Sequence, residues 1–193
     1  MWTPEFEMTK CWDIVMASDT MMQDFSDTIT RDLLHFDIDF ALDYDIAIDI
    51  GGGAMGGIFC VYNIGKRKIL IDPLAEEYKR KYNKIPEGVE TINAYCNDVP
   101  LEDNSIDIIF CFDTLDHCNS KEEYIKSISE IKRILKVNGT LYFILPLRQE
   151  PAEGHPIVNL KNMPLDEILK PFEGLDTKYF VEDGHLYLRG VKI

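Results

Sequence analysis

Basic residues are scarce in this chain of 193 residues. Lys and Arg number 20 against 34 Asp and Glu, which gives a formal net charge of −14 and an isoelectric point near 4.6. A surface of this charge repels the phosphate backbone of nucleic acids and anionic membranes. The few basic runs, at 66–68 and 79–81, are short. The sequence therefore disfavours nucleic-acid and membrane partners and favours small molecules and neutral or cationic partners.

Paired cysteine motifs and long apolar runs are also missing. The five cysteines are odd in number and none has CxxC spacing, which predicts no disulfide framework, no metal site and a reducing compartment. The first residues lack the basic and then apolar pattern of a secretory signal. No apolar run approaches the ~20 residues that span a bilayer. We expect a cytoplasmic protein that is a monomer or a homodimer.

No linker rich in serine, glycine or proline divides the chain, and 46% of its residues are hydrophobic. A single domain with a full core over residues 1–193 is therefore expected. The first forty-odd residues are predicted to be helical, because apolar residues recur at every fourth position from Met21 to Leu33 after a capping Ser18. This helix is expected to pack on the core, and a lid over a substrate pocket is the alternative.

From residue 45 onward, predicted strands and helices alternate. Alternation of this kind predicts a doubly wound, mostly parallel α/β sheet. Three residues join the last two β-rich runs, which is too short for a parallel crossover and predicts an antiparallel hairpin. The predicted strands are 45–50, 68–71, 106–112, 140–145, 177–181 and 185–191, and the predicted helices are 73–82 and a segment from the capping box of Ser120 and Glu123 to Asn138 and Gly139.

The strongest local signal is the run from Asp49 to Gly57, DIGGGAMGG, placed where a strand is expected to turn into a helix. Glycines let the backbone turn tightly and approach a ligand, and the start of a helix offers free amides. Twenty-one residues after Gly51, Asp72 ends the next strand, where a carboxylate can accept both hydroxyls of a ribose. These features predict a nucleoside-bearing cofactor, and a merely tight turn is the alternative.

The same glycines permit a second interpretation. Gly51, Gly53 and Gly56 satisfy GxGxxG, the dinucleotide fingerprint, which on its own is weak evidence for NAD. Asp49 at the end of the strand would meet an incoming pyrophosphate with a like charge, and a terminal hairpin does not belong to a standard dinucleotide fold. An NAD-dependent oxidoreductase is therefore the less favoured hypothesis.

Several ordered motifs resemble those of a known family. They are DIGGGAMGG at 49–57, ILIDP at 69–73, NDVPLEDNSIDIIFCFDTLDH at 97–117 and EIKRILKVNGTLYFILP at 130–146. Over about 45–145 the chain resembles the class I S-adenosylmethionine-dependent methyltransferases, of the small methyltransferase-domain-11 kind. The resemblance implies a three-layer, Rossmann-like sheet of seven strands and S-adenosylmethionine as the cofactor. Because 193 residues leave little room for a large inserted substrate domain, the N-terminal helices at 1–43 are expected to form a cap or lid on a catalytic core at 44–193.

The resemblance assigns roles to residues at the ends of the strands. Family members often bind the adenine amino group with an Asp four residues before their LP pair, and this chain has Tyr95 there. Adenine recognition is then left among the Cys96 backbone, Asn97 and Asp98. Asp113, after the fourth strand, is expected to face the sulfonium and the incoming nucleophile. The remaining expected cofactor-binding residues are Asp49, Gly51, Gly52 and Gly53 for the methionine part, Asp72 for the ribose, and Pro73 with Leu74 for the adenine.

Two histidines are candidate catalytic residues beside Asp113. His117 follows the fourth strand, and a histidine can accept a hydroxyl proton near neutral pH; ordering its loop is the alternative role. His155 follows the fifth strand, and a surface histidine in a turn is the alternative there. A base helps a hydroxyl nucleophile but is not obligatory for an amine or a thiol, because positioning alone supplies much of the rate.

The expected function is methyl transfer to oxygen or nitrogen of a small polar metabolite. The LDH and GHP segments, at 115–117 and 154–156, resemble those of methyltransferases found with glycan-assembly enzymes, and this resemblance implies a sugar or a glycan precursor. A non-catalytic binding or regulatory module with the same fold is the alternative, because Tyr95 departs from the family pattern.

Overall fold

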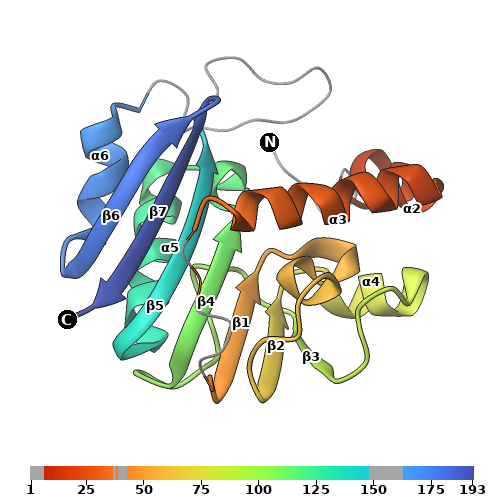
Figure 1. Ribbon diagram of the computed structural model, residues 1–193, viewed down its shortest axis with the longest axis horizontal. Coiled ribbons are helices and arrows are strands. Elements are labelled where there is room, and N and C mark those ends of the chain that lie inside the picture. Colours follow the sequence, from red (N-terminus) through yellow and green to blue (C-terminus); the bar gives the residue numbers. More distant parts are fainter. Residues whose placement is uncertain (1–6, 37, 39–42, 148–162) are drawn as a thin grey trace.

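The computed structural model describes residues 7–36, 38, 43–147 and 163–193 (Figure 1). Its strands form one seven-stranded sheet in the order β3-β2-β1-β4-β5-β7-β6. Strand β7 is antiparallel to both of its neighbours, and the other neighbouring strands are parallel. The predicted mostly parallel sheet with a terminal antiparallel hairpin is confirmed. The strands are β1 (Ile46–Ile50), β2 (Arg67–Ile71), β3 (Val89–Ile92), β4 (Ile106–Phe112), β5 (Leu135–Pro146), β6 (Leu175–Glu182) and β7 (His185–Lys192).

Helices cover both faces of the sheet, which makes three layers. On one face α5 and α6 pack on strand residues such as Ile48 and Phe143. On the other face α3, η3 and α4 pack on residues such as Ala47 and Phe110. The α-helices are α2 (Asp13–Met16), α3 (Asp19–Leu33), α4 (Ala75–Tyr82), α5 (Lys121–Ile134) and α6 (Leu165–Leu169). The short 3₁₀ helices are η2 (Gly53–Met55), η3 (Gly57–Cys60), η4 (Leu115–His117) and η5 (Lys170–Phe172), and η1 (Glu7–Trp12) is a π-helix.

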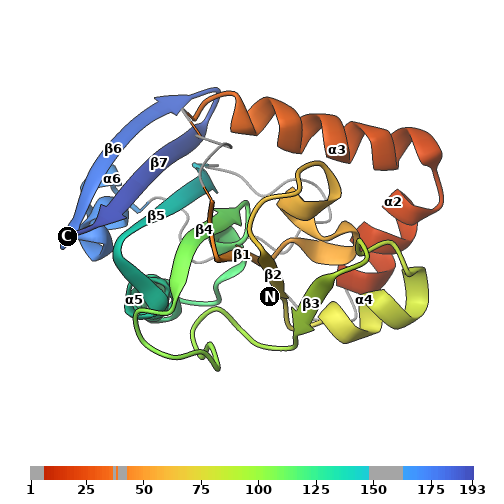
Figure 2. The same cartoon turned by 60° about the horizontal axis from the view of Figure 1, so that its bottom comes forward.

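The N-terminal helices lie over one edge of the sheet. Ser18 caps α3 by accepting a hydrogen bond from the Met21 amide at 3.3 Å, as predicted. The predicted apolar stripe packs inward only in part, because Ile29 and Leu33 are buried but Met21 is exposed. In Figures 1 and 2, α3 extends from the β6–β7 hairpin toward α2 and passes over the carboxyl ends of β4 and β1. The N-terminal segment therefore covers the edge where the parallel strands end.

Two predicted local features are wrong. Helix α5 ends at Ile134 and not at Asn138–Gly139, because the chain joins the sheet at Leu135, which is paired with Ile106. Asn138 instead forms a left-handed kink, with φ 64°, inside β5. The glycine run after β1 leads into two short 3₁₀ turns, η2 and η3, where a helix was expected.

Candidate functional site

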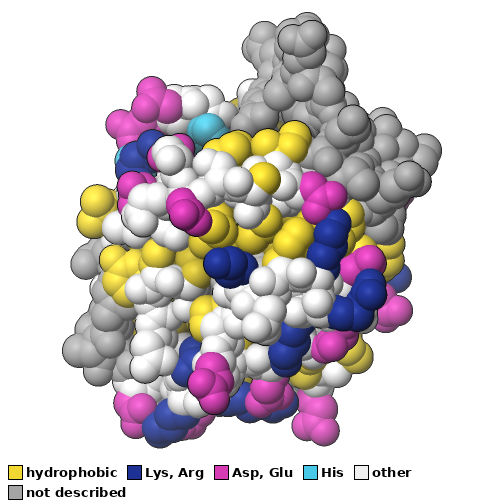
Figure 3. Space-filling view, turned by 90° about the vertical axis from the view of Figure 1, so that its right-hand side faces the viewer, with side chains coloured by type: hydrophobic (Ala, Val, Ile, Leu, Met, Phe, Trp, Pro, Cys, Tyr) yellow, Lys and Arg dark blue, Asp and Glu magenta, His cyan; other side chains and the backbone are white. Residues whose placement is uncertain are grey.

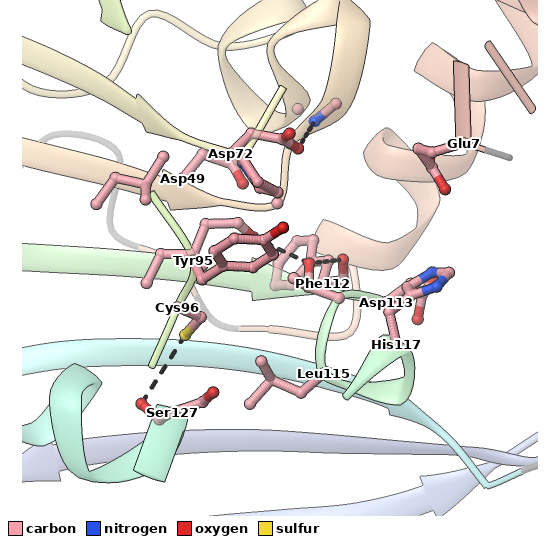
Figure 4. A pocket seen from close by; sticks show the side chains of 18 of the residues that line it. Glu7, Asp49, Asp72, Tyr95, Cys96, Phe112, Asp113, Leu115, His117 and Ser127 are labelled. Carbon is pink, nitrogen blue, oxygen red and sulfur yellow. Dashed lines mark hydrogen bonds between the residues drawn. The ribbon is translucent and has the colours of Figure 1, made fainter. Parts of the chain in front are cut away.

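A cavity of about 240 Å³ opens at the carboxyl edge of the sheet (Figure 4). Its lining residues form three walls. The sheet-edge wall consists of Asp49–Gly53, Gly57, Ile58, Ile71–Pro73, Phe112–Leu115 and His117. The β3–α5 wall consists of Ala94, Tyr95, Cys96, Cys118, Asn119, Glu123 and Ser127. The helical wall consists of Glu7, Trp12, Phe25, Thr28, Ile29 and Asp32, with Tyr78 of α4 beside it.

The glycine bend of the sheet-edge wall has no room for side chains at two positions. Gly53 has a φ of 62°, and a Cβ there would lie 2.0 Å from Cζ2 of Trp12. Gly57 has a φ of 53°, and a Cβ there would lie 2.1 Å from Oδ2 of Asp49. Both the left-handed backbone and the close contacts require glycine. The bend therefore brings bare backbone to the surface of the cavity.

Asp72 lies at the end of β2, and both of its carboxylate oxygens accept hydrogen bonds from backbone amides. Oδ1 accepts a hydrogen bond from the Leu74 amide at 2.8 Å, and Oδ2 accepts one from the Gly53 amide at 3.3 Å. The residue is only 7% exposed, and burial raises the pKa of its carboxyl to about 7. A carboxylate has about four acceptor positions, so acceptor capacity remains for hydroxyls of a ligand.

Asp49 lies beneath the same bend at the end of β1. Its Oδ2 accepts a hydrogen bond from the Ile58 amide at 2.6 Å and so ties the bend to the strand. Burial raises the pKa of this carboxyl to about 7, and the charge of Asp72 adds to the shift. A cation bound in the cavity would favour the ionised form of both groups. The pair is thus suited to a positively charged ligand.

The β3–α5 wall contains only some of the residues that were expected to recognise adenine. Cys96 lines the cavity, and its Sγ donates to the Ser127 carbonyl at 3.8 Å. Asn97 and Asp98 are not among the described residues that line it. Asn97 Nδ2 donates to Glu123 at 3.5 Å, and the Asp98 amide donates to the Tyr95 carbonyl at 3.0 Å.

Asp113 and His117 lie beyond the end of β4 and line the cavity together. Asp113 has a φ of 49°, and its amide donates to the Ile144 carbonyl at 3.1 Å. Thr114 Oγ1 donates to the Ile50 carbonyl at 2.9 Å, which joins this turn to the end of β1. His117 is in η4, with Nε2 3.8 Å from Asp116 Oδ1. In Figure 4, Asp113 and His117 lie on the opposite side of the cavity from Cys96.

The other histidines do not contribute to the described cavity. His155 lies outside the described residues. The rings of His35 and His185 both contact Tyr187 of β7, at centroid distances of 4.4 and 6.3 Å. Neither is among the lining residues. Among residues 7–36, 38, 43–147 and 163–193, no group of three His, Cys, Asp or Glu side chains is placed to hold a metal ion.

Sequence patterns found only part of the helical wall. Phe25 and Ile29 belong to the predicted apolar stripe, but the stripe did not show that they would face a cavity. Trp12 carries no periodic or motif signal. It is 8% exposed and packs on Phe25 and Tyr78, and within the described part of the chain its indole N–H has no acceptor. Glu7, Thr28 and Asp32 had no signal that set them apart from surface residues.

Comparison with known proteins identifies the family of the chain. A family model described as a methyltransferase domain matches residues 48–143, from β1 to β5. The glycine bend and the acid after β2 both lie within that match. The chain belongs to the class I S-adenosylmethionine-dependent methyltransferases. S-adenosylmethionine is the cofactor that membership of this family assigns to it.

Individual proteins also resemble the chain. The uncharacterized protein MJ0638 of Methanocaldococcus jannaschii is 28% identical over 137 residues, which are 66% of this chain and 51% of that protein. This chain therefore spans about half the length of that curated relative. The PH0226 protein of Pyrococcus horikoshii has a TM-score of 0.67 at 14% identity, over 92% of this chain and 93% of that one.

The N-methyltransferase NodS of Bradyrhizobium japonicum, solved with S-adenosyl-L-homocysteine, has a TM-score of 0.61 at 14% identity, over 93% of this chain and 95% of NodS. At such identities the likeness of the solved structures shows a shared fold. The site has features that fit this cofactor. The glycines of the bend line the cavity without side chains, and the two buried carboxyls suit hydroxyls and positive charge.

Proposed function

We propose that the chain transfers the methyl group of S-adenosylmethionine to oxygen or nitrogen of a small polar metabolite. The observation that carries the proposal is the cavity at the sheet edge, where Asp72 and the glycine bend line one wall together. Asp72 accepts the ribose hydroxyls, and Pro73 lies against the adenine. Asp49 and the backbone of Gly51, Gly52 and Gly53 hold the methionine part.

The chain's own residues position the reactants and handle the proton. The cofactor supplies a sulfonium-activated methyl group when it is bound. Positioning of reactants can lower a barrier by about 7–11 kcal/mol, and the cavity serves that purpose. Asp113 faces the reacting atoms, and His117 accepts the proton of a hydroxyl acceptor at its ring nitrogen. His155 remains a proposed second base, outside the described residues.

The charge of the cavity favours some acceptors over others. Glu7 and Asp113 lie on the side away from Cys96 (Figure 4), Asp32 also lines the cavity, and no Lys or Arg is among the described lining residues. A phosphorylated or carboxylated acceptor would meet like charge there. A neutral or cationic acceptor fits better, and a sugar or glycan precursor without phosphate near the reacting atom is one such molecule.

Nucleic acid remains an unfavourable partner in this proposal. On the face shown in Figure 3, Lys and Arg side chains lie among Asp and Glu side chains and form no continuous basic surface.

None of the described helices combines the length and the apolar character needed to cross a bilayer. All five cysteines are free, which supports a reducing, cytoplasmic environment.

We further propose that 1–43 is a cap over a catalytic core at 44–193, within one domain. The helical wall supports this, because residues of η1 and α3 close one side of the cavity. A cap of this kind excludes water from the reacting atoms and admits the acceptor when it moves.

Turnover and ligand binding together test the proposed function. The chain is incubated with S-adenosylmethionine and a panel of sugars, alcohols and amines, and release of S-adenosylhomocysteine is measured, with Asp72→Ala as the control that lacks the ribose acceptor. Release that depends on an acceptor is expected. Binding of S-adenosylhomocysteine without turnover of any acceptor would favour a non-catalytic module, and binding of NADH in its place would favour an oxidoreductase.

A further inference from the structure

The two edge strands of the sheet differ in length and in what they expose. Strand β3 has four residues, and two of them are engaged by side chains, since Glu90 accepts from Arg67 and Thr91 donates to Glu76. Strand β6 has eight residues, and in Figure 1 it lies beyond β7 at the other end of the sheet. Within the described part of the chain, no backbone hydrogen bond joins β6 to a segment other than β7.

The outer edge of β6 carries three consecutive exposed apolar residues. Tyr179, Phe180 and Val181 are 50%, 40% and 48% exposed. Because successive side chains of a strand point to opposite faces, apolar surface is exposed on both faces of the sheet. Such an edge is a template for a further strand, and proteins usually interrupt it with proline, a bulge or charge. Strand β6 has no proline, and its register with β7 is continuous.

Opposite charges flank this apolar run. Lys178 precedes it and Glu182 follows it, so each lies two residues from Phe180. Both side chains are exposed. Glu182 Oε2 lies 3.2 Å from His35 Nδ1, whereas Lys178 forms no ion pair with any described residue. The run therefore has a basic end and an acidic end that are both accessible.

An antiparallel pair of two such runs is self-complementary. When Phe180 of one copy lies opposite Phe180 of the other, Lys178 lies opposite Glu182. Tyr179 then lies opposite Val181. Cross-strand pairs of opposite charge, and of an aromatic with a β-branched side chain, stabilise neighbouring strands. The pairing is symmetric about a two-fold axis, so each of these pairs occurs twice.

The neighbouring registers and other partners lack this match. Centring the pair on Tyr179 would place two acids, Asp176 and Glu182, opposite each other. Centring it on Val181 would place Phe180 opposite Glu182. A strand of unrelated sequence would leave both ends of the run without an opposite charge. The charge pattern therefore favours a second copy of this chain as the partner.

We propose that the chain forms a homodimer in which two β6 strands pair antiparallel around Phe180 and join the two sheets into one. The net charge of −14 on each copy opposes association, so the local match of Lys178 with Glu182 controls whether the strands pair. None of the described residues that line the cavity belongs to β6. The dimer is therefore independent of the proposed function.

Sedimentation equilibrium of the full chain over a range of concentrations tests this contact. The wild type is expected to form dimers. Lys178→Glu and Glu182→Lys each place like charges opposite one another twice, and each is expected to raise the dimer dissociation constant by roughly 10-fold or more. Lys84→Glu is the matched control, because Lys84 is exposed in the loop before β3 and the change in charge is the same. It should leave the dissociation constant unchanged.

A mixture of the two single variants is the sharper test. In a heterodimer of Lys178→Glu with Glu182→Lys, opposite charges face each other again at both positions. The mixture is therefore expected to associate with a dissociation constant near that of the wild type, and so is the double variant. All variants should bind S-adenosylhomocysteine like the wild type, which checks that they are folded.

A wild-type chain that stays monomeric at every soluble concentration would overturn the proposal and leave the β6 edge to a strand of another protein. A dimer that survives both single substitutions, or a mixture that does not associate, would overturn it as well. If Glu182→Lys does not fold because it loses the contact with His35, Lys178→Glu and Lys84→Glu still decide. A wild-type dimer that binds no S-adenosylhomocysteine would count against the proposed function and leave this proposal standing.

Discussion

The sheet-edge wall and the helical wall of the cavity are held in different ways. Hydrogen bonds to backbone groups fix the first, such as those of Asp49 with the Ile58 amide and of Thr114 with the Ile50 carbonyl. Side-chain packing holds most of the second, as in the contact of Trp12 with Phe25 at 5.3 Å. A wall held by few backbone bonds opens at lower free-energy cost. We infer that the sheet-edge wall is preformed and that the helical wall moves to admit ligands.

The largest expected effect concerns the rigidity of the sheet-edge wall. Gly57→Ala would place a Cβ 2.1 Å from Asp49 Oδ2 and 2.8 Å from the Gly52 backbone at a φ of 53°. The free energy of unfolding should fall by about 3 kcal/mol or more, since strain adds to the clash. Gly88→Ala has a similar φ but no atom within 4 Å, so it should cost only about 1 kcal/mol. Equal losses in urea titrations would contradict a tightly packed bend.

The second prediction concerns the buried charge in that wall. The pKa of Asp49 is about 7 in the folded chain and about 3.9 when unfolded. Between these values the folded state binds more protons, so its stability falls as pH rises from 4 through 7. Asp49→Asn removes the charge and keeps an acceptor for the Ile58 amide. At pH 8 the variant without ligand should be about 2 kcal/mol more stable than wild type, and near pH 4 about equal.

Urea unfolding at pH 4.5 and pH 8 measures this difference. Asp45→Asn is the control, because Asp45 is exposed and paired with Lys66, which lowers the pKa of its carboxyl. That variant should show no gain at pH 8. A variant Asp49→Asn that is less stable than wild type at pH 8 would mean that the charge supports the bend even without a cation.

The third prediction concerns the helical wall. Trp12→Ala removes an aromatic side chain that covers Gly53, and we expect roughly 10-fold weaker binding of S-adenosylhomocysteine, or about 1.4 kcal/mol. Ile14→Ala is the matched control, since Ile14 lies in α2, is 51% exposed and does not line the cavity. Calorimetric titration compares the two. Equal weakening of binding by the two variants would mean that the N-terminal helices as a whole, and not Trp12 in particular, contribute to ligand binding.

The smallest effect is expected at His117. His117→Ala should change the dissociation constant of S-adenosylhomocysteine by less than about twofold, because the ring lies on the side away from Cys96. Its effect should fall on turnover, once an acceptor is known. A loss of binding of 10-fold would instead make His117 a cofactor ligand.

The same contrast decides how much could be predicted from the sequence. Strand β4 matches its predicted bounds because a buried parallel strand is a continuous apolar run. Asp49 and Asp72 could be placed because each lies at or next to the end of an apolar run, before Gly51 and Pro73 respectively. Tertiary contacts decide the rest. Trp12 meets Gly53 across 41 positions of sequence, and α5 ends four residues before Asn138 because the next residue pairs with β4.

The most direct measurement of the central claim is a calorimetric titration of the wild-type chain and Asp72→Ala with S-adenosylhomocysteine. We predict one ligand molecule per chain for the wild type and roughly 10- to 100-fold weaker binding by the variant, since a buried charged acceptor would be lost. Asp24→Ala, on the exposed face of α3, should bind like the wild type. No heat of binding at millimolar ligand, or equal affinities of the wild type and Asp72→Ala, would contradict the account.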